Sequence, residues 1–362
     1  MKILVISNYK DIHVVRPEAE IFISLAQRGH DVTIMTYEES NYVSKFKENG
    51  IKIIPFHPEK KFDKTEINFI REEVTKGQFD VMHLFNNVAT INGLKACKNL
   101  PIKIVLYRGY SANMHWWDPT SYLKHLNKRV DYIICNSIGV ADDLVNNGKL
   151  PRKKAIVINK GHELSWYENV QAIDIRNELN ISPDAFLAVL VANNRRMKGV
   201  KYLMEASNFL PSDANIHFLL VGNDIETPDN LKIISESPNK SKVHFLGYRK
   251  DALSIVKSSN VFVLTSIKGE SITKSVLEAM SIGTPTIISD IAGNVELHEN
   301  GVSGIVVPSK NSKAFSDAIY KLYQNPKLAE QFSTKSQDRI KTVLGHQQTV
   351  DKYEEFYKSF SN

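Results

Sequence analysis

Residues 261–285 read Val261-Phe-Val-Leu-Thr-Ser-Ile-Lys-Gly-Glu270-Ser-Ile-Thr-Lys-Ser-Val-Leu-Glu278-Ala-Met-Ser-Ile-Gly-Thr-Pro285. The run from Val261 to Thr265 is β-branched and aromatic and predicts a strand, whereas helix-forming residues from about Thr273 to Met280 predict a helix. In open α/β sheets, ligands bind beyond the carboxyl end of such a strand, where free N–H groups at a helix N-terminus favour a phosphate. The stretch therefore predicts an α/β fold with a ligand site at the loop between strand and helix.

Two carboxylates, Glu270 and Glu278, stand eight positions apart in this stretch. On one continuous helix they would point roughly 80° apart, so both can face one ligand only if Glu270 lies on the loop before the helix. Glu278 falls within the apolar run Val276 to Met280, where a charge without a partner is costly. Two kinds of partner stay open: sugar hydroxyl groups of a ligand, or a neighbouring Lys or Arg on the helix.

Glu-x7-Glu followed by Ala-Met-x-x-Gly-Thr-Pro resembles the signature of the retaining glycosyltransferases of family 4, the glycosyltransferase group 1 type. Segments 243–249, 290–297 and 301–308 follow in the family's order, and the N-terminal half resembles it more loosely. The resemblance implies a GT-B fold, in which two Rossmann-like domains face each other across a deep cleft and a C-terminal helix crosses back to the first domain. It also implies that Glu270 contacts the donor sugar and that Glu278 binds the ribose; further donor-binding candidates are Ser271, Ile272, Thr273, Lys274, Ser275, Tyr248 and Arg249.

The family holds the donor diphosphate with a basic pair earlier in its C-terminal domain. Here the corresponding turn, between a strand ending at Val191 and a helix from about Val200, contains Arg195, Arg196 and Lys198. Fixed cations suit a leaving diphosphate because they neutralise charge that grows as the glycosidic bond breaks. Arg195 and Lys198 are the predicted catalytic pair, although the family commonly spaces this pair further apart. A solvated basic turn is the alternative.

Strands and helices alternate along the whole chain, which predicts parallel sheets. The residue pattern changes near residue 165, where we place the domain boundary. We expect an acceptor-binding Rossmann-like domain at 1–165, joined by a C-terminal helix at 347–362. Residues 166–346 are expected to form a donor-binding Rossmann-like domain. The predicted strands are Lys2 to Ser7, Asp31 to Thr36, Ile51 to Pro55, Asp80 to Leu84, Pro101 to Leu106, Asp131 to Cys135, Ala155 to Ile158, Phe186 to Val191, Ile216 to Val221, Val243 to Leu246, Val261 to Thr265, Pro285 to Ser289 and Gly304 to Val307.

The chain of 362 residues has the length of two domains. Its two cysteines, Cys97 and Cys135, lack metal or disulfide spacing and are expected to be buried thiols in a reducing compartment. No apolar run reaches the ~18 residues of a membrane span, and the N-terminus reads as a strand. We therefore expect a cytoplasmic protein that is either soluble or peripheral at the inner face of the cell membrane.

Positive charge is concentrated in the first half of the chain. Residues 1–165 hold 24 Lys and Arg against 18 Asp and Glu, whereas residues 166–362 hold 22 of each kind. Such an excess attracts an anionic acceptor or an anionic membrane. No nucleic-acid motif accompanies it, so nucleic acid is not an expected partner; an ordinary scatter of surface lysines remains the alternative.

The acceptor-side candidates follow the fifth predicted strand and are Arg108, His115, Trp116 and Trp117. Relatives often place a His near the position of Arg108, so the contribution of this domain to catalysis is open. The two tryptophans are interpreted as a wall against sugar rings or a membrane interface, with core packing as the default alternative. His83 is expected in the interior, and Asn136-Ser137 is expected to cap a helix.

Together these features predict a retaining glycosyltransferase that needs no metal and no cofactor. It would move a hexose-type sugar from a nucleotide diphosphate donor to a hydroxyl of a glycan or lipid-linked acceptor, in bacterial surface polysaccharide or lipopolysaccharide assembly. The glutamate pair is not interpreted as a glycosidase acid and base. Two alternatives stay open: an epimerase or phosphorylase on the same fold, and a non-catalytic accessory protein that binds a nucleotide sugar or a partner transferase.

Overall fold

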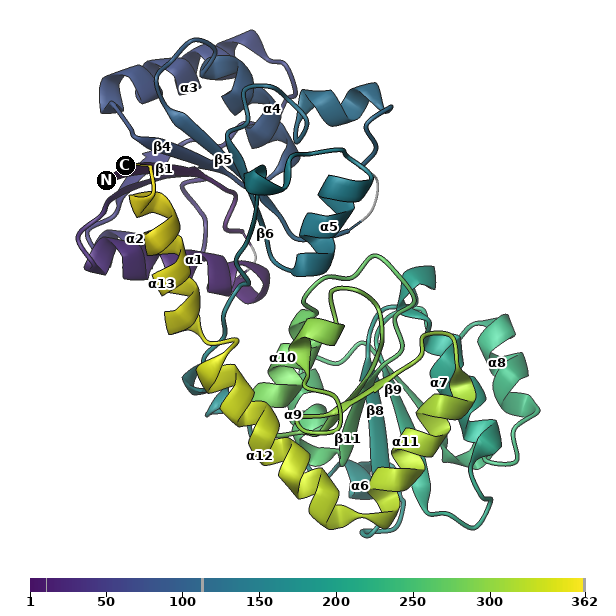
Figure 1. Cartoon of the computed structure of the whole chain (residues 1–362). Coiled ribbons are helices and arrows are strands. Elements are labelled where there is room, and N and C mark those ends of the chain that lie inside the picture. The colour runs from purple at the N-terminus through teal and green to yellow at the C-terminus, as the bar shows by residue number, and fades with distance from the viewer. Residues whose placement is uncertain (11, 112–113, 361–362) are drawn as a thin grey trace. The chain divides into compact units, whose positions relative to one another are not determined.

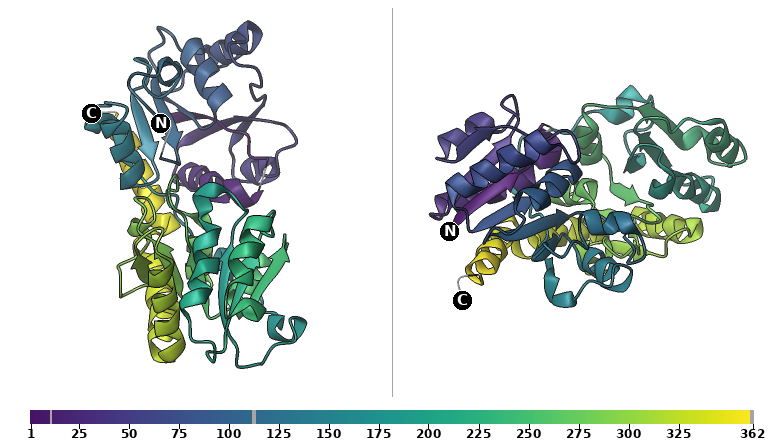
Figure 2. Two further views of the ribbon diagram at one scale, coloured as in Figure 1. Left: turned by 90° about the vertical axis from the view of Figure 1, so that its right-hand side faces the viewer. Right: turned by 90° about the horizontal axis from the view of Figure 1, so that it is seen from above.

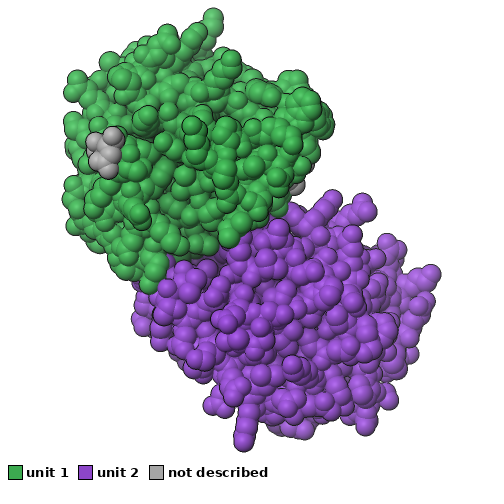
Figure 3. Space-filling model, viewed as in Figure 1, with its two compact units in different colours: residues 1–161, 346–362 green, residues 162–345 purple. Residues whose placement is uncertain are grey.

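The computed structural model describes residues 1–10, 12–111 and 114–360. The chain forms two compact units, coloured separately in Figure 3. Unit 1 comprises Met1–Gly161 and His346–Asn362, and unit 2 comprises His162–Gly345. The sequence placed the corresponding boundaries after residues 165 and 346. Each unit is a parallel sheet with helices on both faces (Figure 1, Figure 2).

Unit 1 contains a seven-stranded sheet in the order β3-β2-β1-β4-β5-β6-β7. Every neighbouring pair in it is parallel; in the central pair, for example, Ile3 lies opposite Val81 and Ile6 opposite Leu84. The strands are β1 (Lys2–Ile6), β2 (Asp31–Thr36), β3 (Lys52–Pro55), β4 (Val81–Leu84), β5 (Lys103–Arg108), β6 (Tyr132–Cys135) and β7 (Ala155–Val157).

Helices cover both faces of this sheet because alternate strand residues bury apolar side chains on each side. One face packs against α3 (Lys64–Gly77), α4 (Asn87–Ala96) and α5 (Ile138–Asn146). The other face packs against α1 (Ile12–Gln27), α2 (Val43–Glu48) and α13 (His346–Lys358). Two short 3-10 segments, η1 (Pro119–Leu123) and η2 (Arg152–Lys154), lie in the connections.

Unit 2 contains a six-stranded parallel sheet in the order β10-β9-β8-β11-β12-β13. Its longest register joins β8 to β9, from Phe186 opposite Ile216 to Val191 opposite Val221. The strands are β8 (Phe186–Val191), β9 (Ile216–Val221), β10 (Val243–Gly247), β11 (Val261–Leu264), β12 (Thr286–Ser289) and β13 (Ile305–Val307).

The two faces of the second sheet carry separate cores. α7 (Val200–Ala206), α8 (Pro228–Ser235) and α11 (Ser312–Gln324) cover one face. α6 (Ile175–Glu178), α9 (Ala252–Ser258) and α10 (Lys274–Ser281) cover the other, while α12 (Pro326–Thr342) contributes Phe332 to the first core and Ile340 to the second. The 3-10 segments of unit 2 are η3 (Leu164–Tyr167), η4 (Arg196–Lys198), η5 (Ser207–Phe209), η6 (Lys240–Lys242) and η7 (Val295–Leu297).

The C-terminal helix α13 belongs to unit 1, as the sequence predicts, and lies beside α1 (Figure 1). Its apolar face buries Val350, Tyr353 and Tyr357 in the core. Arg28 in the connection after α1 donates to Asp351 at 2.6 Å and to Glu354 at 2.7 Å. The helix ends at Lys358; of the predicted segment, residues 361–362 lie outside the described part of the chain.

Every predicted strand is present within a residue or two of its expected bounds. Cys97 and Cys135 are fully buried, and burial raises the pKa of each thiol to about 12, so both are the inert thiols expected. His83 is also buried, with Nδ1 2.9 Å from the Tyr357 hydroxyl. Ser137 caps α5 as predicted. In the described residues, no helix is both long and apolar enough to cross a bilayer.

Candidate functional site

Four of the predicted donor-side residues line one cavity at the carboxyl edge of the unit 2 sheet. The loops after β8, β9 and β10 and the start of α9 surround a cavity of about 390 Å³. Both predicted basic residues, Arg195 and Lys198, line it together with Tyr248 and Arg249. The remaining lining residues are Val191, Ala192, Asn193, Val221, Gly222 and Ala252.

The loop that carries Lys198 is fastened to the loop after β11. Thr265 Oγ1 donates to the Lys198 carbonyl at 3.0 Å, and the Ile267 N–H donates to the Met197 carbonyl at 2.8 Å. Gly199 has a φ of +61°, and a Cβ there would stand 2.3 Å from the Thr265 carbonyl oxygen. Glycine therefore permits both the left-handed turn and the close approach, and these contacts fix Lys198 opposite Glu270.

Lys198 and Glu270 form an ion pair across 72 residues of sequence. The Glu270 carboxylate also accepts from Ser266 Oγ at 3.2 Å, and Thr273 Oγ1 lies 3.4 Å from it. Glu270 precedes α10, so the prediction that it lies on the loop is confirmed. The ion pair is mostly buried yet still reaches solvent, so its carboxylate and ammonium are both held ready for a polar ligand.

The N-terminus of α10 is not capped by a side chain. Thr273 occupies the N-cap position, but its Oγ1 donates to Asn294 Oδ1 at 2.7 Å and does not accept from the first turn. The leading N–H groups therefore stay available to an anion at the positive end of the helix dipole. Around them, Ser271 is buried, Ile272 packs against the core, and Lys274 and Ser275 are half-buried.

The turn in segment 290–297, which matched the family but was given no role, packs against the loop before α10. A Cβ on Gly293 would stand 2.3 Å from Ser271 Cα, so only glycine lets the two backbones meet. The next residue, Asn294, is fully buried; its Oδ1 holds Thr273, while its Nδ2 has no hydrogen-bond partner in the described residues. In the sequence, the family match of segment 290–297 pointed to this turn without giving it a role.

Glu278 has a cationic partner one helical turn away. Lys274 donates to its carboxylate in an i,i+4 ion pair, and the carboxylate is largely buried. Of the two partners that the sequence left open, the structure therefore shows the neighbouring lysine. Glu278 lies on α10 one turn after the half-buried Lys274, and its second carboxylate oxygen is not used in that contact.

Of the remaining donor-side candidates, Arg195 and Arg249 differ in whether they form ion pairs. Arg195 is exposed, and no acidic residue in the described part of the chain forms an ion pair with it. Arg249 instead bonds Glu178 at 2.5 Å and Asp251 at 2.8 Å, and these hydrogen bonds raise its pKa further above its usual value. Tyr248 is exposed beside it. Asn193, which the sequence analysis missed, lines the cavity and accepts from the Asn223 N–H at 3.1 Å.

The acceptor-side candidates lie on unit 1 and do not share one environment. Arg108 is only 2% exposed; its guanidinium is 3.9 Å from the Asp143 carboxylate and stacks over the Tyr110 ring. In this arrangement the Arg108 side chain does not reach an acceptor in solution. Trp116 and Trp117 are 54% and 65% exposed, so the default expectation of core packing is wrong for both. His115 stacks on Trp117, with ring centroids 4.9 Å apart.

Metal ligands do not accumulate at the site. Among the residues that the structure describes, no group of three or more His, Cys, Asp or Glu side chains is arranged to hold a metal ion. The positive charges available at the site are side-chain cations and peptide N–H groups. The expectation that the reaction needs no metal stays a prediction.

Two families match consecutive parts of the sequence. The family described as Glycosyl transferases group 1 matches residues 171–339, within unit 2. The family described as Glycosyltransferase Family 4 matches residues 19–166, almost all of them in unit 1.

Relatives and solved structures agree with these matches. The chain is 26% identical over 332 residues to an N,N'-diacetylbacillosaminyl-diphospho-undecaprenol alpha-1,3-N-acetylgalactosaminyltransferase of Campylobacter jejuni, covering 85% of this chain and 86% of that protein. A glycosyltransferase from Rickettsia africae superposes with a TM-score of 0.81 at 18% identity, covering 100% of this chain and 98% of the other. Anabaena HepE in complex with UDP superposes with a TM-score of 0.77 at 16% identity, covering 99% and 100%. At such identities the superpositions establish the GT-B fold.

Proposed function

The chain belongs to the group 1 glycosyltransferases, and on that premise we propose that it moves a sugar from a nucleotide diphosphate donor to a hydroxyl of a glycan or lipid-linked acceptor. The proposed setting is bacterial surface polysaccharide or lipopolysaccharide assembly at the inner face of the cell membrane. In support, the name of the Campylobacter jejuni relative specifies a diphospho-undecaprenol substrate. The solved HepE structure contains UDP.

One observation carries the proposal: Lys198 and Glu270 meet at the carboxyl edge of the unit 2 sheet, beside the uncapped start of α10. This arrangement presents a cation, a carboxylate and a helix N-terminus within one loop cluster. A diphosphate is bound by the cation and by the helix N-terminus. The carboxylate accepts hydrogen bonds from the hydroxyl groups of a sugar ring. The alternative, a solvated basic turn, does not explain the hydrogen bond from Thr265 Oγ1 to the Lys198 carbonyl.

In the proposed mechanism, the leaving diphosphate is stabilised by Lys198, Arg195 and the N–H groups at the start of α10. Negative charge on these oxygens grows as the glycosidic bond breaks, so fixed positive groups lower the barrier without reorganising. Glu270 holds hydroxyl groups of the donor sugar. The acceptor hydroxyl attacks the anomeric carbon from the face that the leaving diphosphate occupied and gives its proton to that diphosphate, which retains the anomeric configuration. No metal ion is used in this scheme.

Glu278 is proposed to accept hydrogen bonds from the ribose with the oxygen that Lys274 leaves free. Lys274 orients this carboxylate, so the ion pair and the ribose contact are compatible. Replacing Glu278 with Gln should weaken nucleotide diphosphate binding by about 10-fold, the order expected for one charge-assisted hydrogen bond. An unchanged dissociation constant by calorimetry would remove the ribose contact from the proposal.

The decisive experiment has two stages. A panel of nucleotide sugars is screened for a shift in melting temperature, since a ligand at about 100 times its Kd stabilises the folded chain by roughly 2.7 kcal/mol. The best donor is then incubated with and without glycan or lipid-linked acceptors, in buffer containing EDTA. We expect an α-linked product from an α-linked donor, formed only with acceptor.

Other outcomes separate the alternatives. A changed donor sugar without acceptor would indicate an epimerase. Donor binding without any product over the acceptor panel would favour a non-catalytic accessory protein. An inverted product, or activity that EDTA abolishes, would contradict retention or metal independence.

A further inference from the structure

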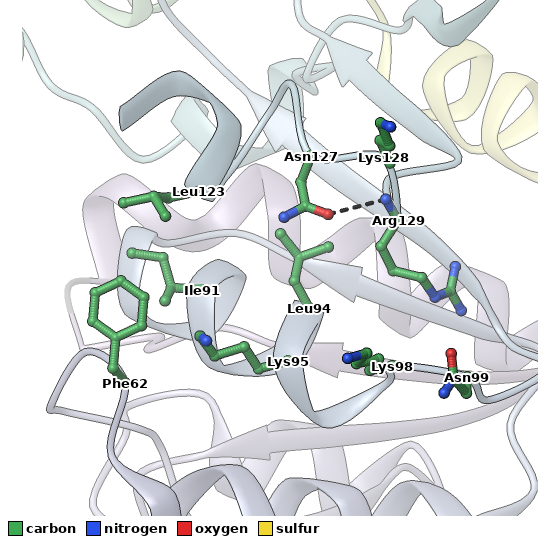
Figure 4. Close-up of a pocket in the computed structure, with 10 residues that line it drawn as sticks. All are labelled: Phe62, Ile91, Leu94, Lys95, Lys98, Asn99, Leu123, Asn127, Lys128 and Arg129. Atoms are coloured by element: carbon green, nitrogen blue, oxygen red, sulfur yellow. Dashed lines mark hydrogen bonds between the residues drawn. The ribbon is translucent and has the colours of Figure 1, made fainter. Parts of the chain in front are cut away.

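Unit 1 contains a second cavity, of about 470 Å³, along the outer side of α4 (Figure 4). Its volume lies in the range of roughly 300–1,000 Å³ typical of ligand sites. Ten residues line it, of which four are apolar, four are cationic and none is acidic: Phe62, Ile91, Leu94, Lys95, Lys98, Asn99, Leu123, Asn127, Lys128 and Arg129. The cavity is therefore amphipathic and has one sign of charge.

The apolar end is held open by a buried amide. Phe62 has a φ of +64°, a conformation that bulky residues rarely adopt. The fully buried Asn92 of α4 accepts from the Phe62 N–H at 2.9 Å and donates to the Lys60 carbonyl at 2.9 Å. These bonds fix the turn, and the Phe62 ring stays 44% exposed beside Ile91. Its apolar surface faces the cavity and not the core of unit 1.

The opposite wall comes from η1 and the turn before β6. Leu123, the last residue of η1, is 43% exposed. Asn127 braces this wall because its Nδ2 donates to the Tyr122 carbonyl at 3.0 Å and its Oδ1 accepts from the Arg129 N–H at 3.0 Å. Two exposed apolar side chains thus stand on separate, braced segments on either side of α4.

At the other end of the cavity, three of the four cationic side chains form no ion pair with a described residue. Among the described residues, Lys95, Lys98 and Lys128 form no ion pair, whereas Arg129 bonds Asp131 at 3.0 Å. Lys95 Nζ lies 5.3 Å from the Phe62 ring centroid and joins the two ends. Hydrocarbon walls and uncompensated ammonium groups together match a molecule with a hydrocarbon chain and an anionic head.

We propose that this cavity binds an anionic phospholipid of the membrane surface. Its acyl chain would lie against Phe62 and Leu123, and its phosphate would rest on Lys95, Lys98 and Lys128. Exposed aromatic residues continue from η1: Tyr122 donates from its hydroxyl to the Trp116 carbonyl at 2.7 Å, and Trp117 is the next residue. Aromatic side chains of this kind gather at the level of lipid headgroups.

Topology favours a bilayer lipid over the lipid-linked acceptor as the occupant. Lys98 follows α4 and Lys128 precedes β6, so both stand at the amino ends of the unit 1 strands. The carboxyl ends, where parallel sheets present their ligand sites, are at the opposite edge. A phosphate at these lysines would therefore be far from that edge. The proposal concerns a site separate from the donor site and depends on no step of the proposed transfer reaction.

The test is vesicle sedimentation without donor or acceptor, so its failure leaves the transferase proposal intact. We expect wild-type protein to sediment with phosphatidylglycerol–phosphatidylcholine vesicles and not with phosphatidylcholine alone. The double variant Lys98→Gln/Lys128→Gln should bind about 20- to 30-fold more weakly, and Leu123→Ser about 5-fold more weakly. The control Lys47→Gln/Lys76→Gln removes two exposed lysines from α2 and α3 and should bind within about 2-fold of wild type.

Several results would overturn the proposal. Equal loss in the control pair would mean that net charge, not the cavity, drives binding. Equal binding to both vesicle types, or release by millimolar inorganic phosphate, would exclude a specific anionic lipid. If a variant loses its far-UV circular dichroism, wild-type protein can be cross-linked to a photoactivatable phosphatidylglycerol. Cross-links should then map to α4 and η1, and cross-links confined to other segments would sink the assignment.

Discussion

The six strands of unit 2 follow the order of the first six strands of unit 1, but the connection that follows the fourth strand differs between the units. In unit 1, only residues 85–86 separate β4 from α4, and Asn86 Oδ1 accepts from the Ala89 N–H at 2.9 Å. In unit 2, residues 265–273 separate β11 from α10, and Thr273 leaves the first turn uncapped. The same sheet edge is therefore closed by a side chain in one unit and open to a ligand in the other. In these two units the helix is capped where the preceding loop is short and left without a side-chain cap where that loop is long.

The largest effect is expected when Lys198, the cation at the uncapped edge of the unit 2 sheet, is removed. Lys198→Met should lower turnover by about 10² to 10³, the order seen when one group that stabilises transition-state charge is lost. Lys201→Met removes an exposed lysine on the next helix and should leave turnover within about 2-fold of wild type. Steady-state kinetics measure both. Similar losses in the two variants would show that general basicity, not the position of Lys198, matters.

Removing the carboxylate comes next in size. Glu270→Gln keeps the shape but loses the charge that pairs with Lys198, so turnover should fall by about 10²-fold with a melting temperature within about 4 °C of wild type. Asp317→Asn breaks a surface ion pair with Lys313 in the same unit and serves as the control. Wild-type turnover in Glu270→Gln would end the role assigned to this loop.

A third test compares the two cores under acid. Burial lowers the pKa of His83 in unit 1 and of His298 in unit 2 to about 3. Between pH 6.5 and about 3 the unfolded chain binds protons that the folded chain does not, so stability falls as pH falls in that window. At pH 5 each group accounts for a loss of about 2 kcal/mol relative to pH 7.

Hydrogen exchange separates the units in this test. His83→Phe should remove about 2 kcal/mol of the acid dependence from the amides of β1 and β4. The amides of β12, beside His298, should keep theirs. If β1 and β4 in the variant lose as much stability as in wild type, His83 is not the titrating group.

The smallest expected effect concerns the closed edge. Asn86→Ala should lower the free energy of unfolding by about 1 kcal/mol, because the Ala89 N–H loses its cap, without changing turnover. Urea unfolding measures the first quantity and steady-state kinetics the second. The exposed neighbour Asn87 gives the matched control Asn87→Ala. A loss of turnover in Asn86→Ala would show that the unit 1 edge also takes part in the reaction.

Local patterns carried much of the prediction. Strand positions, the start of α10 and the placement of Glu270 before it follow from side-chain periodicity and helix geometry, which act over a few residues. The pairing of Glu278 with Lys274 is also local, being one helical turn. For Trp116 and Trp117 the sequence left an exposed wall and core packing both open, because apolar character alone does not say whether a side chain in a connection faces solvent; the structure shows both exposed.

By itself, the sequence determined the two α/β halves and the residues from which a donor site could be built, whereas the return of the C-terminal helix to unit 1 was implied by the family resemblance. Only the tertiary structure decided that Lys198 meets Glu270, that Gly293 lies under Ser271, and that Phe62 and Leu123 face each other across α4. These contacts join segments far apart in the chain, and their geometry depends on sheet register and backbone approach. Such distances are set by packing the whole unit, which no short window of residues encodes.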